Sequence, residues 1–131
     1  MVKITITIET EGDNKMSAIS TLEETLLRSG ITAADTVVPT TKQRIADLTG
    51  SPFATMAFSI MGQDASFTVY PLLWNETLDK YVLGDYMVIT ADTEYNIAVN
   101  GTTDLYVYVS AVSGATGVTP SLDITVKPAL L

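Results

Sequence analysis

TDLYVYVSAVSG, residues 103–114, alternates side chains in a way that predicts a β-strand with two water-poor faces. The aliphatic face carries Leu105, Val107, Val109 and Ala111. The opposite face carries Tyr106, Tyr108, Ser110 and Val112. A surface strand of a small antiparallel sheet usually has one dry and one wet face. The tyrosine face therefore predicts a cover, supplied either by a second layer of this chain or by another subunit.

Similar alternation recurs along the chain and predicts further strands. Residues 2–9 give the clearest period of two, with Ile4, Ile6 and Ile8 on one face. From residue 53 onward the expected inward positions are Ala54, Met56, Phe58, Ile60, Phe67, Val69, Leu73, Tyr95, Ile97, Val99, Leu122, Ile124 and Val126. Asn100-Gly101 is the strongest hairpin signal and predicts that 94–99 pairs with 102–109.

One segment near the N-terminus has helical rather than strand spacing. Ile19, Leu22 and Leu26 recur every three or four residues, Ser17 is a candidate N-cap, and Gly30 is a candidate C-terminal stop. We therefore expect a short helix near 17–29 that lies over one end of a β core. The stretch 31–52 is mixed, and Thr40 begins either a short helix ending near Leu48 or a loop.

These signals together predict a mainly β fold in one domain, residues 1–131. The expected architecture is an antiparallel β-sandwich, jelly-roll or immunoglobulin-like, of seven or eight strands with one short N-terminal α-helix. The abundance of threonine agrees with this class, because β-branched residues fit pleated, half-buried surfaces.

The composition excludes several classes of function. The chain has no cysteine and no histidine, so disulfides, thiolate metal sites and histidine-based proton transfer are absent. The net charge is −8 and the seven basic residues are scattered, so we expect neither nucleic acid nor membranes as partners. The start MVKITITIE predicts a strand and not a signal peptide, so synthesis is expected in a host cytoplasm.

Catalysis is not expected either. The acidic residues that could act in pairs or bind calcium sit mostly in predicted turns, where carboxylates commonly bond local backbone: Asp79, Asp85, Asp92, Glu94 and Asp104. No phosphate-binding glycine loop and no nucleophile motif is present. We therefore assign no catalytic, cofactor-binding or metal-binding residue.

Aromatic residues and the first strand are the candidate interaction sites. The rings of Tyr70, Trp74, Tyr81, Tyr106 and Tyr108 suit three roles: internal packing, contact with a neighbouring subunit, or stacking on a glycan. The strand at 2–9 pairs either within its own sheet or with a neighbouring copy. The interface candidates are Tyr106, Tyr108, Tyr70 and Trp74, with Ile4, Ile6 and Ile8 if the strand is exchanged.

Several of these features together resemble the small β-sandwich proteins of tailed-phage virions, especially head decoration or cement proteins. They are a short acidic chain without Cys or His, heavy use of Thr and Ala, a strand directly after Met1, and hairpins such as ITADTEYNIAVNGTTDLYVYVSAV. The resemblance implies a structural virion protein that forms homo-oligomers, with trimers favoured, and binds the major capsid protein. The alternative is a carbohydrate- or receptor-binding β-sandwich module of a phage tail or fibre.

Overall fold

The computed structural model describes residues 3–9, 19–46, 48, 50–99 and 104–129. These residues form strands and connecting segments, and no helix occurs among them. The strands are β1 (Lys3–Glu9), β2 (Ile19–Ile31), β3 (Phe53–Met61), β4 (Ser66–Asn75), β5 (Lys80–Leu83), β6 (Met87–Ile89), β7 (Thr93–Ala98), β8 (Leu105–Ser113) and β9 (Ser121–Ala129). The expectation of a mainly β, antiparallel protein is confirmed.

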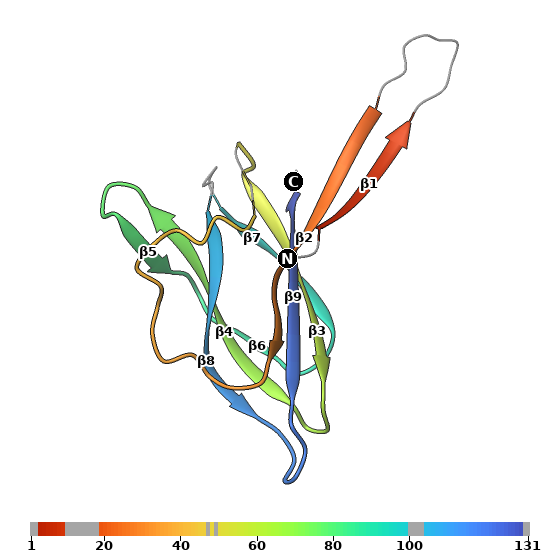
Figure 1. Cartoon of the computed structure of the whole chain (residues 1–131), viewed down its shortest axis with the longest axis vertical. Coiled ribbons are helices and arrows are strands. Elements are labelled where there is room, and N and C mark those ends of the chain that lie inside the picture. Colours follow the sequence, from red (N-terminus) through yellow and green to blue (C-terminus); the bar gives the residue numbers. More distant parts are fainter. Residues whose placement is uncertain (1–2, 10–18, 47, 49, 100–103, 130–131) are drawn as a thin grey trace.

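The strands are arranged in two antiparallel sheets (Figure 1). Sheet A has the order β1-β2-β9-β3-β7. Sheet B is built on β4, which pairs with β8 along one edge and with β5 and β6 in succession along the other. One hydrophobic cluster joins residues of both sheets, with Met56 and Ile124 from sheet A and Phe67 and Val107 from sheet B. The core therefore lies between the sheets.

Most of the expected inward positions are buried. Ala54, Met56, Phe58, Phe67, Val69, Val99, Leu122, Ile124 and Val126 belong to the core. Leu105, Val107 and Val109 are also buried, which confirms the first part of the aliphatic face of β8. Beyond Val109 the expected faces are wrong: Ala111 is exposed and Val112 packs against the core, because the β4–β8 register shifts between Thr68 and Val69. Tyr95 instead lies at the surface on edge strand β7, where its ring meets Phe58 edge-on at 6.0 Å.

The helix expected near 17–29 is wrong over the described residues, because Ile19–Ile31 is strand β2. β2 pairs first with β1 and then with β9, and the register shifts between Leu26 and Arg28 and between Arg28 and Ile31. From Glu24 onward the buried residues of β2 are Thr25, Leu27 and Ile31, whereas Leu26, which belongs to the helical pattern, is only half-buried. Gly30 does adopt the left-handed conformation, with φ of 62°, but inside this irregular strand.

The pairing of 94–99 with 102–109, expected from Asn100-Gly101, is also wrong. Strand β7 pairs with β3 in sheet A, whereas β8 pairs with β4 in sheet B. The chain therefore crosses between the sheets after β7, and residues 100–103 lie outside the described part. The segment 40–46, for which helix and loop were both open, contains no regular structure.

Strands β1 and the first half of β2 form a two-stranded arm of sheet A that extends beyond the other strands of the molecule (Figure 1). Lys3 pairs with Thr25 and Glu9 with Ile19, whereas β9 pairs with β2 only from Thr25 onward. Among the described residues β1 is hydrogen-bonded to a strand along one edge only. No helix in the described part is long and apolar enough to cross a membrane.

Candidate functional site

The outer face of sheet B brings four predicted interface residues together. In β4, Tyr70 and Trp74 alternate with residues of the core, and in β8 so do Tyr106 and Tyr108. The register pairs Tyr70 with Tyr108, and the two rings are 6.4 Å apart. The aromatic face expected from the sequence is therefore a continuous surface that spans two strands.

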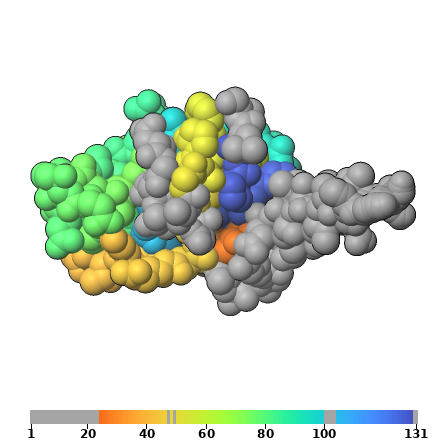
Figure 2. Space-filling view, turned by 90° about the horizontal axis from the view of Figure 1, so that it is seen from above, coloured from red at the N-terminus to blue at the C-terminus, as the bar shows by residue number. Residues whose placement is uncertain are grey.

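Part of this face is covered by the chain itself. The connector, residues 32–46, leaves β2 and runs along the outside of sheet B toward β5 (Figure 1), and Figure 2 shows it in orange and gold beside the green β4–β5 end. Asp35 holds it to β8: its amide donates to the Val109 carbonyl at 2.8 Å, and its Oδ2 accepts from the Val109 amide at 2.8 Å. The connector thus covers the tyrosine face of β8.

An ion pair reinforces the same attachment. Arg28 binds both carboxylate oxygens of Asp35, at 2.6 and 3.0 Å, and its guanidinium lies 5.6 Å from the centre of the Tyr106 ring. Partial burial alone would raise the pKa of Asp35, but the hydrogen bonds from Arg28 and Val109 outweigh it and lower this pKa. Tyr108 adds a hydrogen bond of 3.3 Å from its hydroxyl to the Asp35 carbonyl.

A second cluster anchors the far end of the connector. The Trp74 and Tyr81 rings meet edge-on at 5.0 Å, and the Tyr81 hydroxyl donates to the buried carboxylate of Asp104. The Gln43 amide donates to the Tyr81 oxygen at 2.9 Å, and the Arg44 amide donates to Asp104 Oδ1 at 2.7 Å. Burial, with the nearby Asp104 carboxylate, raises the pKa of the Tyr81 hydroxyl well above its ordinary range.

A cleft of about 330 Å³ lies beside this cluster, between the connector and the β4–β5 turn. It is lined by Thr40, Thr41, Lys42, Arg44, Trp74 and Asp79. Trp74 was among the candidate residues, but the connector residues were not. Lys42 and Arg44, two basic residues two positions apart in a chain with a net charge of −8, were the sequence signal that could have pointed to this cleft. Their proximity to Trp74 depends on a fold that pattern analysis does not supply.

The other part of the aromatic face is exposed. Tyr86 and Val88 are 58% and 49% accessible, and the Tyr86 ring lies 5.7 Å from that of Tyr70. Leu83 extends this apolar surface along β5 at 45% accessibility. Trp74 and Tyr106 are thus enclosed by the chain's own contacts, whereas Tyr70 borders an open surface.

The isoleucines of the first strand lie elsewhere, on the arm. The register places Ile4 opposite Glu24, Ile6 opposite Leu22 and Ile8 opposite Ser20. Strand β1 belongs to sheet A, so the seven predicted interface residues form two separate groups: one on the arm and one on the outer face of sheet B. In the structure of the single chain, β1 pairs with β2.

Two of the carboxylates considered for catalysis or calcium binding accept hydrogen bonds from residues that are distant in sequence, not from the backbone of their own turns. Asp92 Oδ1 accepts from the Ile60 amide of β3 at 2.8 Å. Asp104 is engaged with Tyr81 and the Arg44 amide. Across the described residues no group of three or more acidic side chains is placed to hold a metal ion.

Comparison with known proteins adds no relative to this picture. No protein-family model, no curated protein and no solved structure matches the chain.

Proposed function

We propose that the chain is a non-enzymatic structural subunit that assembles with copies of itself, as a capsid decoration or cement protein of a phage head does. In this proposal the two sheets form a β-sandwich of jelly-roll or immunoglobulin type, the oligomer is closed, with a trimer favoured, and the further partner is the major capsid protein. The observation that carries the proposal is the two-stranded arm formed by β1 and the first half of β2.

The arm needs a partner for energetic reasons. An isolated two-stranded hairpin is only marginally stable in water, because it buries little apolar surface against the entropy of ordering its chain. The arm residues of β2, from Ile19 to Glu24, pair with β1 but not with β9. A neighbouring subunit that adds a strand or an apolar surface to the arm supplies the missing burial.

Its sequence supports the same role. Ile4, Ile6 and Ile8 occupy alternate positions of β1, and Ile6 pairs with Leu22. Alternate residues of a strand share a face, so β1 carries its isoleucines on one face and its threonines on the other. An unpaired edge beside an apolar face is a common site of strand addition between chains.

The exposed part of the sheet B face is the second proposed contact. Tyr70, Tyr86 and Val88 form an aromatic and aliphatic surface next to the connector. Tyrosine is enriched at protein interfaces because its ring offers apolar area together with a hydroxyl. Tyr106, Tyr108 and Trp74 contribute less directly, since the connector already packs or hydrogen-bonds against them.

Electron microscopy of the concentrated protein tests this function. We expect closed particles of uniform size for the unmodified chain and for Thr7→Lys. Ile6→Lys places a charge on the apolar face of β1 and is expected to leave separate subunits. Circular dichroism of each variant checks that the β fold is intact. Separate subunits for the unmodified chain, or equal assembly by both variants, would contradict the proposal.

A further inference from the structure

We propose that the cleft beside Trp74 binds a carboxylated sugar, such as a uronic acid unit of an acidic polysaccharide. The site is formed by the connector and the β4–β5 turn and does not involve the arm. The proposal is therefore independent of assembly. It rests on the shape of the cleft, one unpaired cation, and the aromatic ring, carboxylate and threonine hydroxyls of the residues that line it.

Arg44 supplies the charge that would bind the carboxylate. Among the described residues, Lys42 is paired with Glu76 at 2.6 Å and Arg28 with Asp35 at 2.6 Å, but the exposed Arg44 side chain has no ion-pair partner. A guanidinium can bind a carboxylate through two parallel hydrogen bonds. The single unpaired cation of the cleft thus selects an acidic ligand over a neutral one.

The backbone at Arg44 is held in an unusual conformation. Its φ is 56°, which non-glycine residues seldom adopt, and its amide is bound to the buried carboxylate of Asp104. Gln43 is fixed in turn by Tyr81, and its side-chain amide donates to the Thr41 carbonyl at 2.9 Å. This network holds the connector wall in place before a ligand arrives, which reduces the entropy lost on binding.

The opposite wall is also fixed. The Leu78 amide donates to Asn75 Oδ1 and the Asp79 amide to the Asn75 carbonyl, both at 2.8 Å. Asp79 has φ of 56° and lines the cleft together with Thr40 and Thr41. A carboxylate and two hydroxyls in one lining offer acceptors and donors to a sugar ring, which carries hydroxyl groups around its edge.

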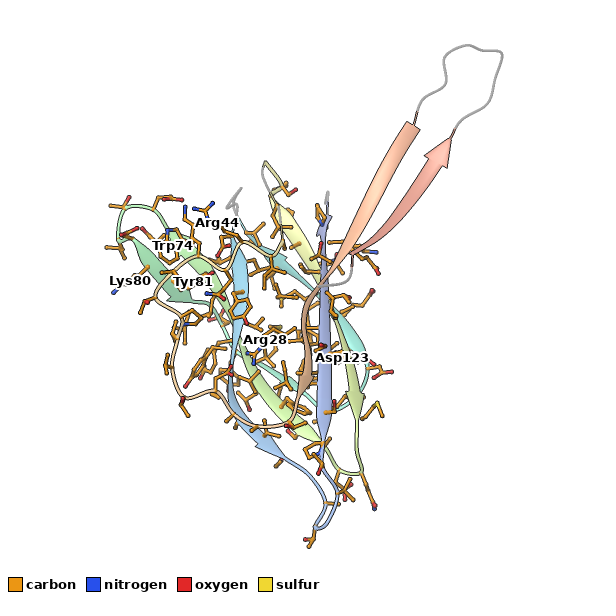
Figure 3. The ribbon with its side chains drawn as sticks, viewed as in Figure 1. Arg28, Arg44, Trp74, Lys80, Tyr81 and Asp123 are labelled. Carbon is orange, nitrogen blue, oxygen red and sulfur yellow. The ribbon has the colours of Figure 1, made fainter. Side chains whose placement is uncertain are left out.

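Trp74 lines the cleft, and Lys42 Nζ lies 5.7 Å from the centre of its ring. The residue is 8% accessible, and its indole Nε1 is buried and has no hydrogen-bond partner among the described residues. A buried polar group without a partner is uncommon in native proteins, and a bridging water is a usual explanation. Figure 3 shows Trp74, Tyr81, Arg44 and Lys80 at the same end of the molecule.

The size of the cleft agrees with one sugar unit. Its volume of about 330 Å³ lies at the lower end of the range for small-molecule sites, which begins at about 300 Å³. An open, shallow site of this kind binds a single unit weakly, and a polymer gains strength from repetition.

Titration with D-glucuronate tests the proposal, with the fluorescence of Trp74 as reporter, because the chain has one tryptophan. Isothermal titration calorimetry of the same samples measures binding independently of the fluorophore. D-glucose, sodium acetate and sodium chloride serve as comparison ligands. We expect saturable binding of glucuronate only, weakened about tenfold or more in Arg44→Gln.

Lys80→Gln is the matched control, because it removes the same charge at the same end of the molecule outside the cleft lining. It should bind glucuronate as the unmodified chain does. Equal binding of glucose or of acetate would overturn the carboxylated-sugar assignment, and so would equal weakening by both variants. Absence of heat and of any fluorescence change would overturn the site altogether. Ile6→Lys, which tests assembly, should leave glucuronate binding unchanged.

Discussion

At the scale of single residues, two aspartates fasten the connector to sheet B, one at each end. The Asp35 carboxylate accepts hydrogen bonds from the Val109 amide and the Arg28 guanidinium. The Asp104 carboxylate accepts hydrogen bonds from the Tyr81 hydroxyl and the Arg44 amide. Such charge-assisted hydrogen bonds are stronger than neutral ones, and losing one partner leaves the other unsatisfied. The cover of the aromatic face therefore depends on a few side chains, each of which can be tested separately.

Asp35→Asn should lower the free energy of unfolding by about 1–3 kcal/mol at neutral pH, since it weakens a partly buried ion pair. Chemical denaturation measures the change, with the exposed Glu94→Gln as control. The pKa of Asp35 is lowered from its ordinary 3.8, so its stabilising effect is present above that value and is lost as the pH falls through the lowered pKa. A difference between Asp35→Asn and the unmodified chain that persists in strong acid would contradict this account.

Tyr81→Phe should cost about 1–3 kcal/mol at neutral pH, because it leaves the buried Asp104 carboxylate without its hydroxyl partner. The folded state also raises the pKa of Tyr81 above the ordinary 10.0. The Tyr81 hydroxyl therefore makes its full contribution to the free energy of unfolding below its ordinary pKa of 10.0. This contribution is lost as the pH rises toward the raised pKa. Denaturation curves at increasing alkaline pH should show a decline in the unmodified chain that is smaller in Tyr81→Phe.

At the scale of elements, two glycines with positive φ differ in what a side chain would meet. A Cβ on Gly62, whose φ is 113°, would come within 2.9 Å of Pro120 Cα, whereas one on Gly117, whose φ is 79°, would meet nothing within 4 Å. Gly117→Ala should therefore cost about 1 kcal/mol from backbone strain alone. Gly62→Ala should cost about 3 kcal/mol, because the β3–β4 turn must also move away from Pro120. Equal costs in denaturation would rule out this close contact.

The arm is the second element with a distinct expectation. Amide hydrogens of β1 in dilute protein should exchange much faster than those of β9, which lies between β2 and β3 in sheet A. On assembly the same β1 amides should become protected. Hydrogen exchange at low and high protein concentration, read by mass spectrometry, makes the comparison. Fast exchange of β1 at every concentration would show that no partner covers the arm.

The sequence predicted those elements whose burial follows a simple alternation. Residues 2–9, 53–60 and 122–127 were expected as strands, and β1, β3 and β9 match them within a residue or two at each end. Strand β2 was missed because Ile19, Leu22 and Leu26 recur at helical spacing, whereas the strand buries Thr25 and Leu27, which do not belong to that pattern. Its strand conformation comes from pairing with β1 and β9. Local propensity does not reveal these pairings, and β9 is also distant from β2 in the sequence.

The candidate site was predicted in part for the same reason. Tyr106 and Tyr108 were placed on one face of a strand, because alternation within a strand is a local property. Their position beside Tyr70 follows from the β4–β8 pairing, which the sequence did not predict. The role of Asp35 and Arg44 could not be seen, since both lie in a connector whose path is set by contacts with β8 and with Tyr81. The pairing expected from Asn100-Gly101 failed because a turn signal does not specify whether the next strand joins the same sheet.

At the scale of the whole molecule, the net charge and the arm are expected to act in opposite directions on the proposed self-association. Each subunit carries a net charge of −8, so copies repel one another at low ionic strength. Apolar and strand contacts through the arm are much less sensitive to salt. Raising the salt concentration from about 0.01 to 0.15 M shortens the screening length from about 30 to 8 Å and should strengthen self-association. Sedimentation velocity at the two concentrations measures the shift, and weaker association in salt would mean that ion pairs hold the assembly.

Light scattering after size exclusion, over a series of protein concentrations, tests the proposed assembly through the arm most directly. We predict a closed oligomer whose mass is a small multiple of 14.0 kDa, three being favoured, for the unmodified chain and for Thr7→Lys. Ile6→Lys should elute with the mass of one subunit. A single subunit mass for the unmodified chain at every concentration, or an oligomer that survives Ile6→Lys unchanged, would contradict the account.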